Sequence, residues 1–325
     1  MTKKINTVTG PISQEELGIT LCHEHFFIGQ PGWDGDRTIA PFSSEKLVSM
    51  GTDLVSGLAP YNIGTIVDAT ANDFGRQPEI YKKIAEQTGV NIICSTGFFN
   101  ESEGASGYWK FRELLGNAEK ELYEVMKTEI TVGIHGTDIK AGVIKIATGK
   151  DIISDYEKMI FRAAAKAQTE TGVPIITHTQ DGTMAPEQAE FLISEGVDPS
   201  KILISHMSSN LDIAYQEKTL EYGVSAGWDR LGLFGLANVP TDEEKNQVIA
   251  ELINKGWIEK IFLSHDYIMK WLGREAEPPE IVKPMLENWY PDHIFLRTIP
   301  ALRKLDISDE QIDTILRKNP MRLFS

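Results

Sequence analysis

The sequence has few cysteines, no long hydrophobic run and no excess of positive charge. Its two cysteines, Cys22 and Cys94, lie inside apolar stretches, so we interpret them as reduced packing residues rather than a disulfide framework. No run approaches the roughly 18 apolar residues of a membrane span, and the first residues lack the apolar core of a signal peptide. These absences predict a cytoplasmic protein with no membrane partner.

The charge balance disfavours one class of partner. A formal net charge of −15 and a pI near 5.0 argue against binding to nucleic acid, which depends on Lys and Arg neutralising phosphates. A neutral or small anionic substrate remains compatible with this charge, because the local charge of a cleft need not follow the total.

The organisation of the chain indicates its fold class. At 325 residues it is long enough for two ordinary domains or for one large α/β barrel. No linker rich in Gly, Ser or Pro divides it, which favours a single domain over residues 1–325. Short apolar runs alternate with amphipathic helical stretches in about eight units, the number in a (β/α)8 TIM barrel. A doubly wound open sheet is the alternative, and it would also place a ligand site at the carboxyl ends of its strands.

The predicted elements follow this alternation. A short cap precedes the first strand, and helices fill the C-terminus. Ser43 or Ser44 is the predicted N-cap of the first helix, whereas Gly89 and Gly172 end the second and the fourth. Strands are predicted at 18–28, 65–70, 91–98, 142–148, 174–179, 202–207, 223–228 and 261–267. Helices are predicted at 44–58, 78–88, 117–130, 155–171, 185–195, 212–222 and 242–255.

The first predicted strand, GITLCHEHFFI, carries His23 and His25. Residues two apart in a strand point to the same face, so both imidazoles converge on one point. Neutral imidazole is a common ligand of transition metals. Taken alone, the same string is also compatible with two buried structural histidines.

Further chemically active side chains lie in or at the ends of later predicted strands. Catalytic groups of barrel enzymes lie at the C-terminal ends of the strands. Buried Lys, His and Asp side chains are costly unless they are paired or bound to a metal. Their arrival together on strands of one barrel therefore indicates a metal centre. The added residues are Lys145, His178, His206 and Asp266.

The strings HEH, GVIKIA, ITHT, ISHM, GWDR and LSHD, in this order and spacing, resemble the phosphotriesterase family of the amidohydrolase superfamily. Within it the likeness is strongest to the phosphotriesterase-like lactonases, and it runs from TGPIS to NPMRLF. The resemblance implies a homodimeric hydrolase with two divalent metal ions. The implied ligands are His23, His25 and Asp266 for one ion, His178 and His206 for the other, and a carboxylated Lys145 as the bridge.

Physical chemistry agrees with this ligand set. An ordinary lysine ammonium would repel two dications, whereas carboxylation turns Lys145 into a bridging anion. Two metals about 3.5 to 4 Å apart can share a water, lower its pKa and hold the substrate oxygen that becomes charged. Zn is the expected metal, and Fe, Co and Mn suit the same mixed ligands. Asp266 is expected to accept the proton of the attacking hydroxide and pass it to the leaving alkoxide.

Substrate choice is expected to lie in the loops. Arg230, after the seventh strand, matches a lactonase arginine that lines the site; the alternative is a surface ion pair with Asp229 or another acid. Phe99 stands where the family's lactonases often have a tyrosine, which leaves the metal chemistry intact but removes a phenol from the site. The stretches 231–239 and 267–272 are apolar, as suits a lactone with an aliphatic tail, and contain Phe234, Leu236, Met269 and Trp271.

Other polar residues are predicted to lie outside the metal centre. Glu24 and His265 face away from it by strand alternation, and His135 and His293 are expected to be surface or capping residues.

We therefore predict a binuclear metal-dependent lactonase that hydrolyses γ- or δ-lactones, N-acyl homoserine lactones among the candidates, with promiscuous organophosphate hydrolysis. One alternative is an organophosphate triesterase. Another is a lactonase for phosphorylated sugar lactones, which needs a phosphate-binding cluster for which Arg230, Lys270 and Arg274 are candidates. A metal-free barrel acting as a binding protein is a third alternative, which the complete ligand set disfavours.

Overall fold

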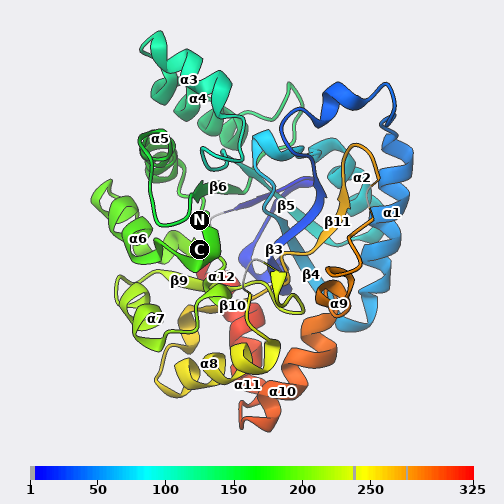
Figure 1. Ribbon diagram of the computed structural model, residues 1–325, viewed down its shortest axis with the longest axis vertical. Helices are drawn as coiled ribbons and strands as arrows, with labels where there is room; N and C mark the ends of the chain where they lie inside the picture. Colours follow the sequence, from blue (N-terminus) through cyan, green and yellow to red (C-terminus); the bar gives the residue numbers. More distant parts are fainter. Residues whose placement is uncertain (1–3, 237–238, 276) are drawn as a thin grey trace.

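The computed structural model describes residues 4–236, 239–275 and 277–325. Within these residues, eight parallel strands, β3 to β10, follow one another around a barrel, and helices surround them (Figure 1). The strands lie in the sheet in the order of the sequence, without the reversal of a doubly wound sheet. The fold is therefore the expected (β/α)8 barrel. No helix of the described part is long and apolar enough to cross a membrane.

The barrel strands lie close to their predicted positions. The helices agree with the predicted ranges to within two residues at each end, apart from α3, which has no predicted counterpart. The strands are β3 (Ile19–Ile28), β4 (Ile63–Asp68), β5 (Asn91–Thr96), β6 (Val143–Thr148), β7 (Ile175–Thr179), β8 (Ile202–Ile204), β9 (Ser225–Trp228) and β10 (Ile261–Leu263). The helices are α1 (Ser44–Gly57), α2 (Pro78–Thr88), α3 (Ser106–Leu114), α4 (Ala118–Thr131), α5 (Asp155–Thr171), α6 (Ala185–Ser194), α7 (Ile213–Leu220), α8 (Asp242–Asn254), α9 (Lys283–Leu286), α10 (Ile299–Lys304), α11 (Asp309–Asp313) and α12 (Asn319–Leu323).

Local signals explain why the helix ends were predictable. Ser43 is the N-cap of α1, and its hydroxyl accepts a hydrogen bond from the amide of Lys46 at 3.3 Å. Helix α2 begins at Pro78 and ends at Gly89, which adopts a φ of 75°. These residues act within one turn of chain, so their effect does not depend on the rest of the fold.

The barrel closes where β3 meets the segment that follows β10. The amide of Asp266 donates to the carbonyl of His23 at 3.1 Å, and the amide of His25 donates to the carbonyl of Tyr267 at 2.9 Å. A short strand, β11 (Ile268–Trp271), then pairs in parallel with the second half of β3. The first strand is thus held on both sides, and its histidines lie beside Asp266.

An apolar cluster fills the barrel at the N-terminal ends of its strands. A hairpin of β1 (Ile5–Thr7) and β2 (Gly10–Ile12) covers this end, as the predicted cap requires. Cys22 belongs to the cluster, and both cysteines are buried and free, as expected. The buried members are Ile5, Leu17, Cys22, Val67, Ile93, Val143, Ile176, Leu203, Phe262, Leu323 and Phe324.

Two predicted assignments were wrong. The last strand was expected to run to Tyr267, but β10 ends at Leu263, and the predicted loop at 267–272 contains β11. Helix α3 was not predicted, because its large side chains do not separate into a buried and a polar face. Trp109 is buried, whereas Tyr108, Phe111 and Leu114 are exposed.

Candidate functional site

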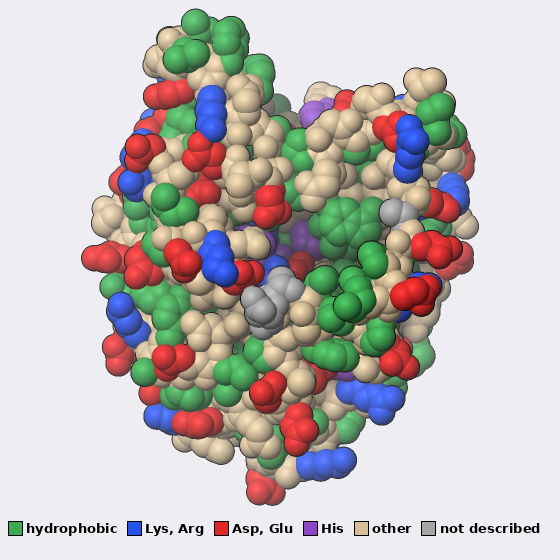
Figure 2. All heavy atoms as spheres, in the orientation of Figure 1, with side chains coloured by type: hydrophobic (Ala, Val, Ile, Leu, Met, Phe, Trp, Pro, Cys, Tyr) green, Lys and Arg blue, Asp and Glu red, His purple; other side chains and the backbone are tan. Residues whose placement is uncertain are grey.

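A cavity of about 140 Å3 opens at the C-terminal ends of the barrel strands. Figure 2 shows histidine side chains deep in the hollow at the centre of the molecular face. The six residues predicted as ligands all line this cavity, from five different strand regions. They are His23, His25, Lys145, His178, His206 and Asp266.

The local shape of β3 directs its histidines inward. Cys22 already packs inside the barrel, and simple alternation would turn His23 outward. The pairing of β3 with β4 shifts in register between Leu21 and Glu24, and such an irregularity re-aims the following side chains. His23 and His25 therefore both face the cavity, whereas Glu24 accepts a hydrogen bond from His265 Nδ1 at 2.7 Å, away from the cavity, as expected.

Asp229 is a member of the site that the sequence did not reveal. Its carboxylate lies 2.8 Å from His23 Nδ1 and 3.0 Å from His206 Nδ1, and it accepts the amide of His206 at 2.8 Å. This carboxylate therefore turns the Nε2 atoms of both rings toward the cavity. The alternative of a surface ion pair between Arg230 and Asp229 is wrong, because Arg230 pairs with Asp266. The GWDR string contains Asp229, but only the fold brings it under both histidines.

The remaining imidazoles are oriented in the same way. His25 Nδ1 lies 2.8 Å from the hydroxyl of Thr70, so its Nε2 faces Asp266 Oδ1 at 3.1 Å. His178 Nε2 lies 2.9 Å from Gln180 Oε1, which leaves Nδ1 facing His206 Nε2 at 2.8 Å. Each ring has one nitrogen held by the protein and the other directed at a shared centre, the arrangement of metal ligands.

Lys145 lies between the two groups of histidines and is almost fully buried. Its Nζ is 2.8 Å from His23 Nε2. Burial lowers the pKa of Lys145 to about 8, against the opposing effect of Asp266 and Asp229. Gly97, just after β5, lies against its backbone, and a Cβ there would be 2.0 Å from the Lys145 carbonyl oxygen. A glycine is therefore required at this position by the close approach of the two strands.

Burial also keeps the histidines neutral. It lowers the pKa of His23 to about 3, with a further contribution from Lys145, and holds the pKa of His178 well below its usual value. Burial opposes ionisation of Asp266, but the neighbouring His206 and His25 outweigh it and hold the pKa of that carboxyl well below its usual range. Neutral imidazoles and ionised carboxylates are the protonation states that bind divalent metals.

Two of these residues have unusual backbone conformations. His206 and Asp266 adopt φ values of 63° and 54°, which non-glycine residues rarely do. Such strain is found where the surrounding structure fixes a side chain for function. Both residues follow the end of a strand, and this backbone conformation directs their side chains into the cavity.

The donor set passes a test of fit to metal ions. The possible ligand atoms of His23, His206 and Asp266 lie within 4.8 Å of one another. The other three side chains face the same space, and carboxylate, hydroxyl or amide oxygens hold the far nitrogen of each ring. Mixed nitrogen and oxygen ligands suit Zn, Fe, Co or Mn.

The wall of the cavity contains part of the predicted lining. Phe99, Arg230 and Trp271 line it, but Phe234 and Met269 are not among the described lining residues. Met269 packs against the main hydrophobic core instead. The predicted apolar stretch 231–239 includes residues 237 and 238, which lie outside the described part. The Phe99 ring packs edge-on against His178, with centroids 4.7 Å apart.

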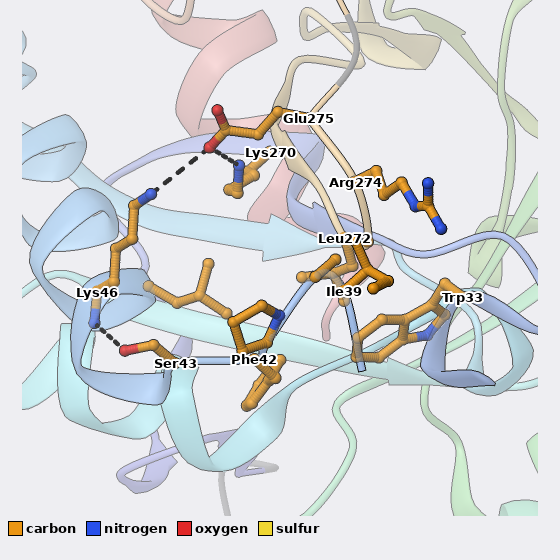
Figure 3. A pocket seen from close by; sticks show the side chains of 13 residues that line it. Trp33, Ile39, Phe42, Ser43, Lys46, Lys270, Leu272, Arg274 and Glu275 are labelled. Carbon is orange, nitrogen blue, oxygen red and sulfur yellow. Dashed lines mark hydrogen bonds and ion pairs between the residues drawn. The ribbon is translucent and has the colours of Figure 1, made fainter. Parts of the chain in front are cut away.

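Two residues considered for phosphate binding lie elsewhere. Lys270 and Arg274 line a second cavity of about 450 Å3, in which Lys270 pairs with Glu275 (Figure 3). Arg274 pairs with Asp36 at 2.6 Å. Of these three candidates, Arg230 lines the cavity at the strand ends, so the phosphate-binding cluster that the sugar-lactone alternative requires is not assembled from them.

Arg230 contacts the site directly, whereas His135 and His293 lie outside it. The Arg230 Nε lies 3.2 Å from Asp266 Oδ2, and Nη1 lies 3.3 Å from the hydroxyl of Ser209. His135 is exposed, as expected. His293 was expected to be a surface or capping residue; it precedes the helix Ile294–Thr298 as its N-cap, without a side-chain cap hydrogen bond, but the surface position was wrong, because this residue is buried, with Nε2 2.6 Å from Asp242.

Comparisons with known proteins agree with this geometry. An organophosphorus hydrolase from Deinococcus radiodurans has 47% sequence identity and a TM-score of 0.98, with 100% of this chain and 97% of that chain covered. A variant of a lactonase from the same organism, described as PTE-like, has 47% identity and a TM-score of 0.97, with 99% and 100% covered. An aryldialkylphosphatase from Saccharolobus solfataricus is 33% identical over 318 residues, 97% of each chain.

The model of the phosphotriesterase family matches almost the whole chain. The match extends over residues 3–324. Members of this kind are hydrolases that act on ester bonds, and the barrel, with its cluster of side chains that could hold a metal ion, is consistent with that chemistry. The chain belongs to the phosphotriesterase family.

Proposed function

We propose that the protein is a lactonase that depends on two divalent metal ions and hydrolyses γ- or δ-lactones, with weaker hydrolysis of organophosphate triesters. The observation that carries the proposal is the cavity itself, in which buried donors lie beside the apolar side chains of Phe99 and Trp271, with Arg230 and Glu103 also in the wall. N-acyl homoserine lactones belong to the proposed class, because their aliphatic tail would contact Phe99 and Trp271.

The residues have distinct roles in this proposal. One metal would be held by His23, His25 and Asp266, the other by His178 and His206, and carboxylated Lys145 would contact both. When bound, the ions supply Lewis acidity and lower the pKa of water. Asp266 accepts the proton of the attacking water through its carboxylate and delivers it to the leaving alkoxide. Zn is the proposed metal, with Fe, Co or Mn as alternatives.

The size of the cavity favours a lactone over a triester. The described residues bound about 140 Å3. Typical ligand pockets have about 300–1,000 Å3, so this cavity would enclose a lactone ring, with any aliphatic tail extending out of it, more easily than a phosphorus centre with three bulky arms. The triesterase remains the second candidate, because one relative is named an aryldialkylphosphatase and one solved neighbour an organophosphorus hydrolase. The phosphorylated sugar lactone loses support with the separation of Lys270 and Arg274 from Arg230.

We also propose that the protein forms a homodimer through α3. This helix exposes Tyr108, Phe111 and Leu114, and its C-cap Leu115 is exposed as well. Figure 2 has hydrophobic side chains at its upper left, over α3 in Figure 1. Exposed apolar patches of this kind support protein association. Lys110 and Arg112 of the same helix already pair with Glu101 and Glu121, so the proposed contact between two copies related by twofold symmetry rests on the apolar side chains.

The substrate assignment predicts a difference in efficiency. Aliphatic γ- or δ-lactones should be hydrolysed with kcat/KM at least about 10²-fold above that of an aryl dialkyl phosphate, a gap of roughly 2.7 kcal/mol in barrier. A panel that varies ring size, tail length and phosphate, run on metal-loaded protein with metal-stripped protein as control, measures it. Equal or reversed efficiencies would favour the triesterase.

The role of Asp266 predicts a loss of turnover. Asp266→Asn keeps a weak oxygen ligand but cannot take a proton, so kcat should fall by about 10²-fold or more. Metal content measured on the same preparation should change less than kcat. Turnover that stays within a few-fold of the parent protein would remove Asp266 from the role of proton carrier.

The bridge predicts chemical rescue. Lys145→Ala should lose at least one metal and most activity, because an alanine cannot link two dications. Propionate added with excess metal should restore part of the activity, whereas an alkylamine should not, because only the acid supplies a bridging anion. Lys150→Ala is the matched control, since this exposed lysine pairs with Asp181 and should keep both metals. A Lys145→Ala protein with two metals and normal turnover would refute the bridge.

The proposed dimer predicts a change in association. Leu114→Glu should weaken the dimer at least about tenfold in sedimentation at micromolar concentration, because it buries a charge in the apolar contact. Glu113→Gln, on the same helix, is the control and should leave association unchanged. A parent protein that sediments as a monomer, or a Leu114→Glu dimer of unchanged affinity, argues against α3 as the interface.

A further inference from the structure

Lys245 occupies a position that is unfavourable for a lysine in two ways. Its side chain is fully buried, although burial of an ammonium is costly. It also lies four residues after the N-cap Thr241, near the N-terminal end of α8, where the helix dipole disfavours positive charge. A lysine in such a place needs strong compensation, and the contacts of its Nζ provide it.

These contacts hold the turn that follows β9. Lys245 Nζ donates to the carbonyl oxygens of Arg230 and Leu233, both at 2.6 Å, and to Asp242 Oδ1 at 2.9 Å. The Asp242 carboxylate in turn accepts the amide of Gly232 at 3.0 Å. The lysine and the aspartate therefore bind the turn through two carbonyls and the amide between them.

The turn itself has little freedom to adjust. Gly232 adopts a φ of 88°, and a Cβ at this residue would lie 2.4 Å from the carbonyl oxygen of Asn288. His293 Nε2 lies 2.6 Å from Asp242 Oδ2 and supports the aspartate from the other side. The clamp, defined as Lys245 with Asp242, thus fixes a tight turn of backbone against the barrel.

The first residue of this turn is the one that enters the site. Arg230 is mostly buried, and its guanidinium contacts Asp266 and Ser209. A long side chain keeps one geometry only if its backbone is fixed, because a small shift of the turn would move the guanidinium away from Asp266 Oδ2. The clamp is the described contact that fixes the Arg230 carbonyl from inside the protein.

We propose that Lys245, together with Asp242, is a positioning residue that acts through Arg230 and sets how the guanidinium meets Asp266 and the substrate. Its ammonium faces backbone carbonyls rather than the cavity, so it takes no part in the reaction itself. The inference rests on the proposed function, since it assigns the residue that holds Arg230 in position to contact the ester substrate. A purely structural role would stabilise α8 without coupling to Arg230.

A double-mutant cycle distinguishes the two roles. Lys245→Met removes the ammonium with a small change in volume, and it should lower kcat/KM about tenfold in the parent protein, the scale of coupling within one hydrogen-bond network. In an Arg230→Ala background the same substitution should lower kcat/KM less than twofold, because the group that it positions is gone. Equal losses in both backgrounds, or no loss in the parent, would overturn the proposal.

Lys260→Met is the matched control. Lys260 donates to the carbonyl of Gly223 at 2.5 Å, near the opposite end of β9, so its loss removes a similar bond without touching the turn. It should leave kcat/KM within twofold in both backgrounds. If Lys245→Met does not fold, Asp242→Asn takes its place in the cycle, because it weakens the same clamp at the Gly232 amide.

Hydrogen exchange provides a readout that does not depend on the substrate. Peptides covering residues 229–236 should exchange about tenfold faster in Lys245→Met than in the parent protein, and Lys260→Met should leave them unchanged. The kinetic cycle uses whichever ester or triester of the panel is hydrolysed, so failure of the lactonase assignment would leave this test intact. Unchanged exchange in Lys245→Met would overturn the clamp.

Discussion

The functional site depends on the seam at which the first strand of the barrel meets the last. Glu24 provides the main contact there. Its Oε1 accepts from the Ser264 hydroxyl at 2.9 Å and from the His265 amide at 2.9 Å, and its Oε2 accepts from the Tyr267 amide at 2.9 Å. A single buried carboxylate therefore fixes the turn that contains Asp266. Hydrogen bonds to a charged acceptor are stronger than neutral ones, each about 1.5–3 kcal/mol, so the turn can hold Asp266 in a strained conformation.

Two further buried carboxylates determine the electrostatics of the cavity. Asp229 fixes His23 and His206 from behind, while Asp266 faces the cavity, and the imidazoles between them are neutral. In the described structure, Arg230 is the permanent cation that contacts Asp266. The Lys145 ammonium, with a pKa of about 8, also lies among these donors, so the two carboxylates face two cations at neutral pH. Carboxylation of Lys145 would replace one of these cations with an anion and would thereby attract divalent cations.

The sequence predicted the fold, and the six side chains that meet in one cavity, to the extent that the signals are local or periodic. Proline, glycine and serine caps act within one turn, which explains the close agreement for α1, α2 and α5. The prediction that His23 and His25 face the same side held, although the pairing of β3 with β4 contains a register shift that the sequence does not reveal. Asp229 was missed as an orienting group because its role depends on contact with two strands at once. Lys270 and Arg274 were misplaced because strand β11 directs neighbouring residues into different cavities, and that strand forms only through pairing with β3.

The preference between ester classes then becomes a question of shape rather than of metal chemistry. The donors of the cavity floor suit a lactone carbonyl and a phosphoryl oxygen equally, so they do not discriminate between the two. The discriminating parts lie above them, where Phe99 packs on His178 and the guanidinium of Arg230 is held at Asp266. Because the turn beneath Arg230 is clamped by a fully buried lysine, the guanidinium cannot retreat cheaply from a bulky substrate.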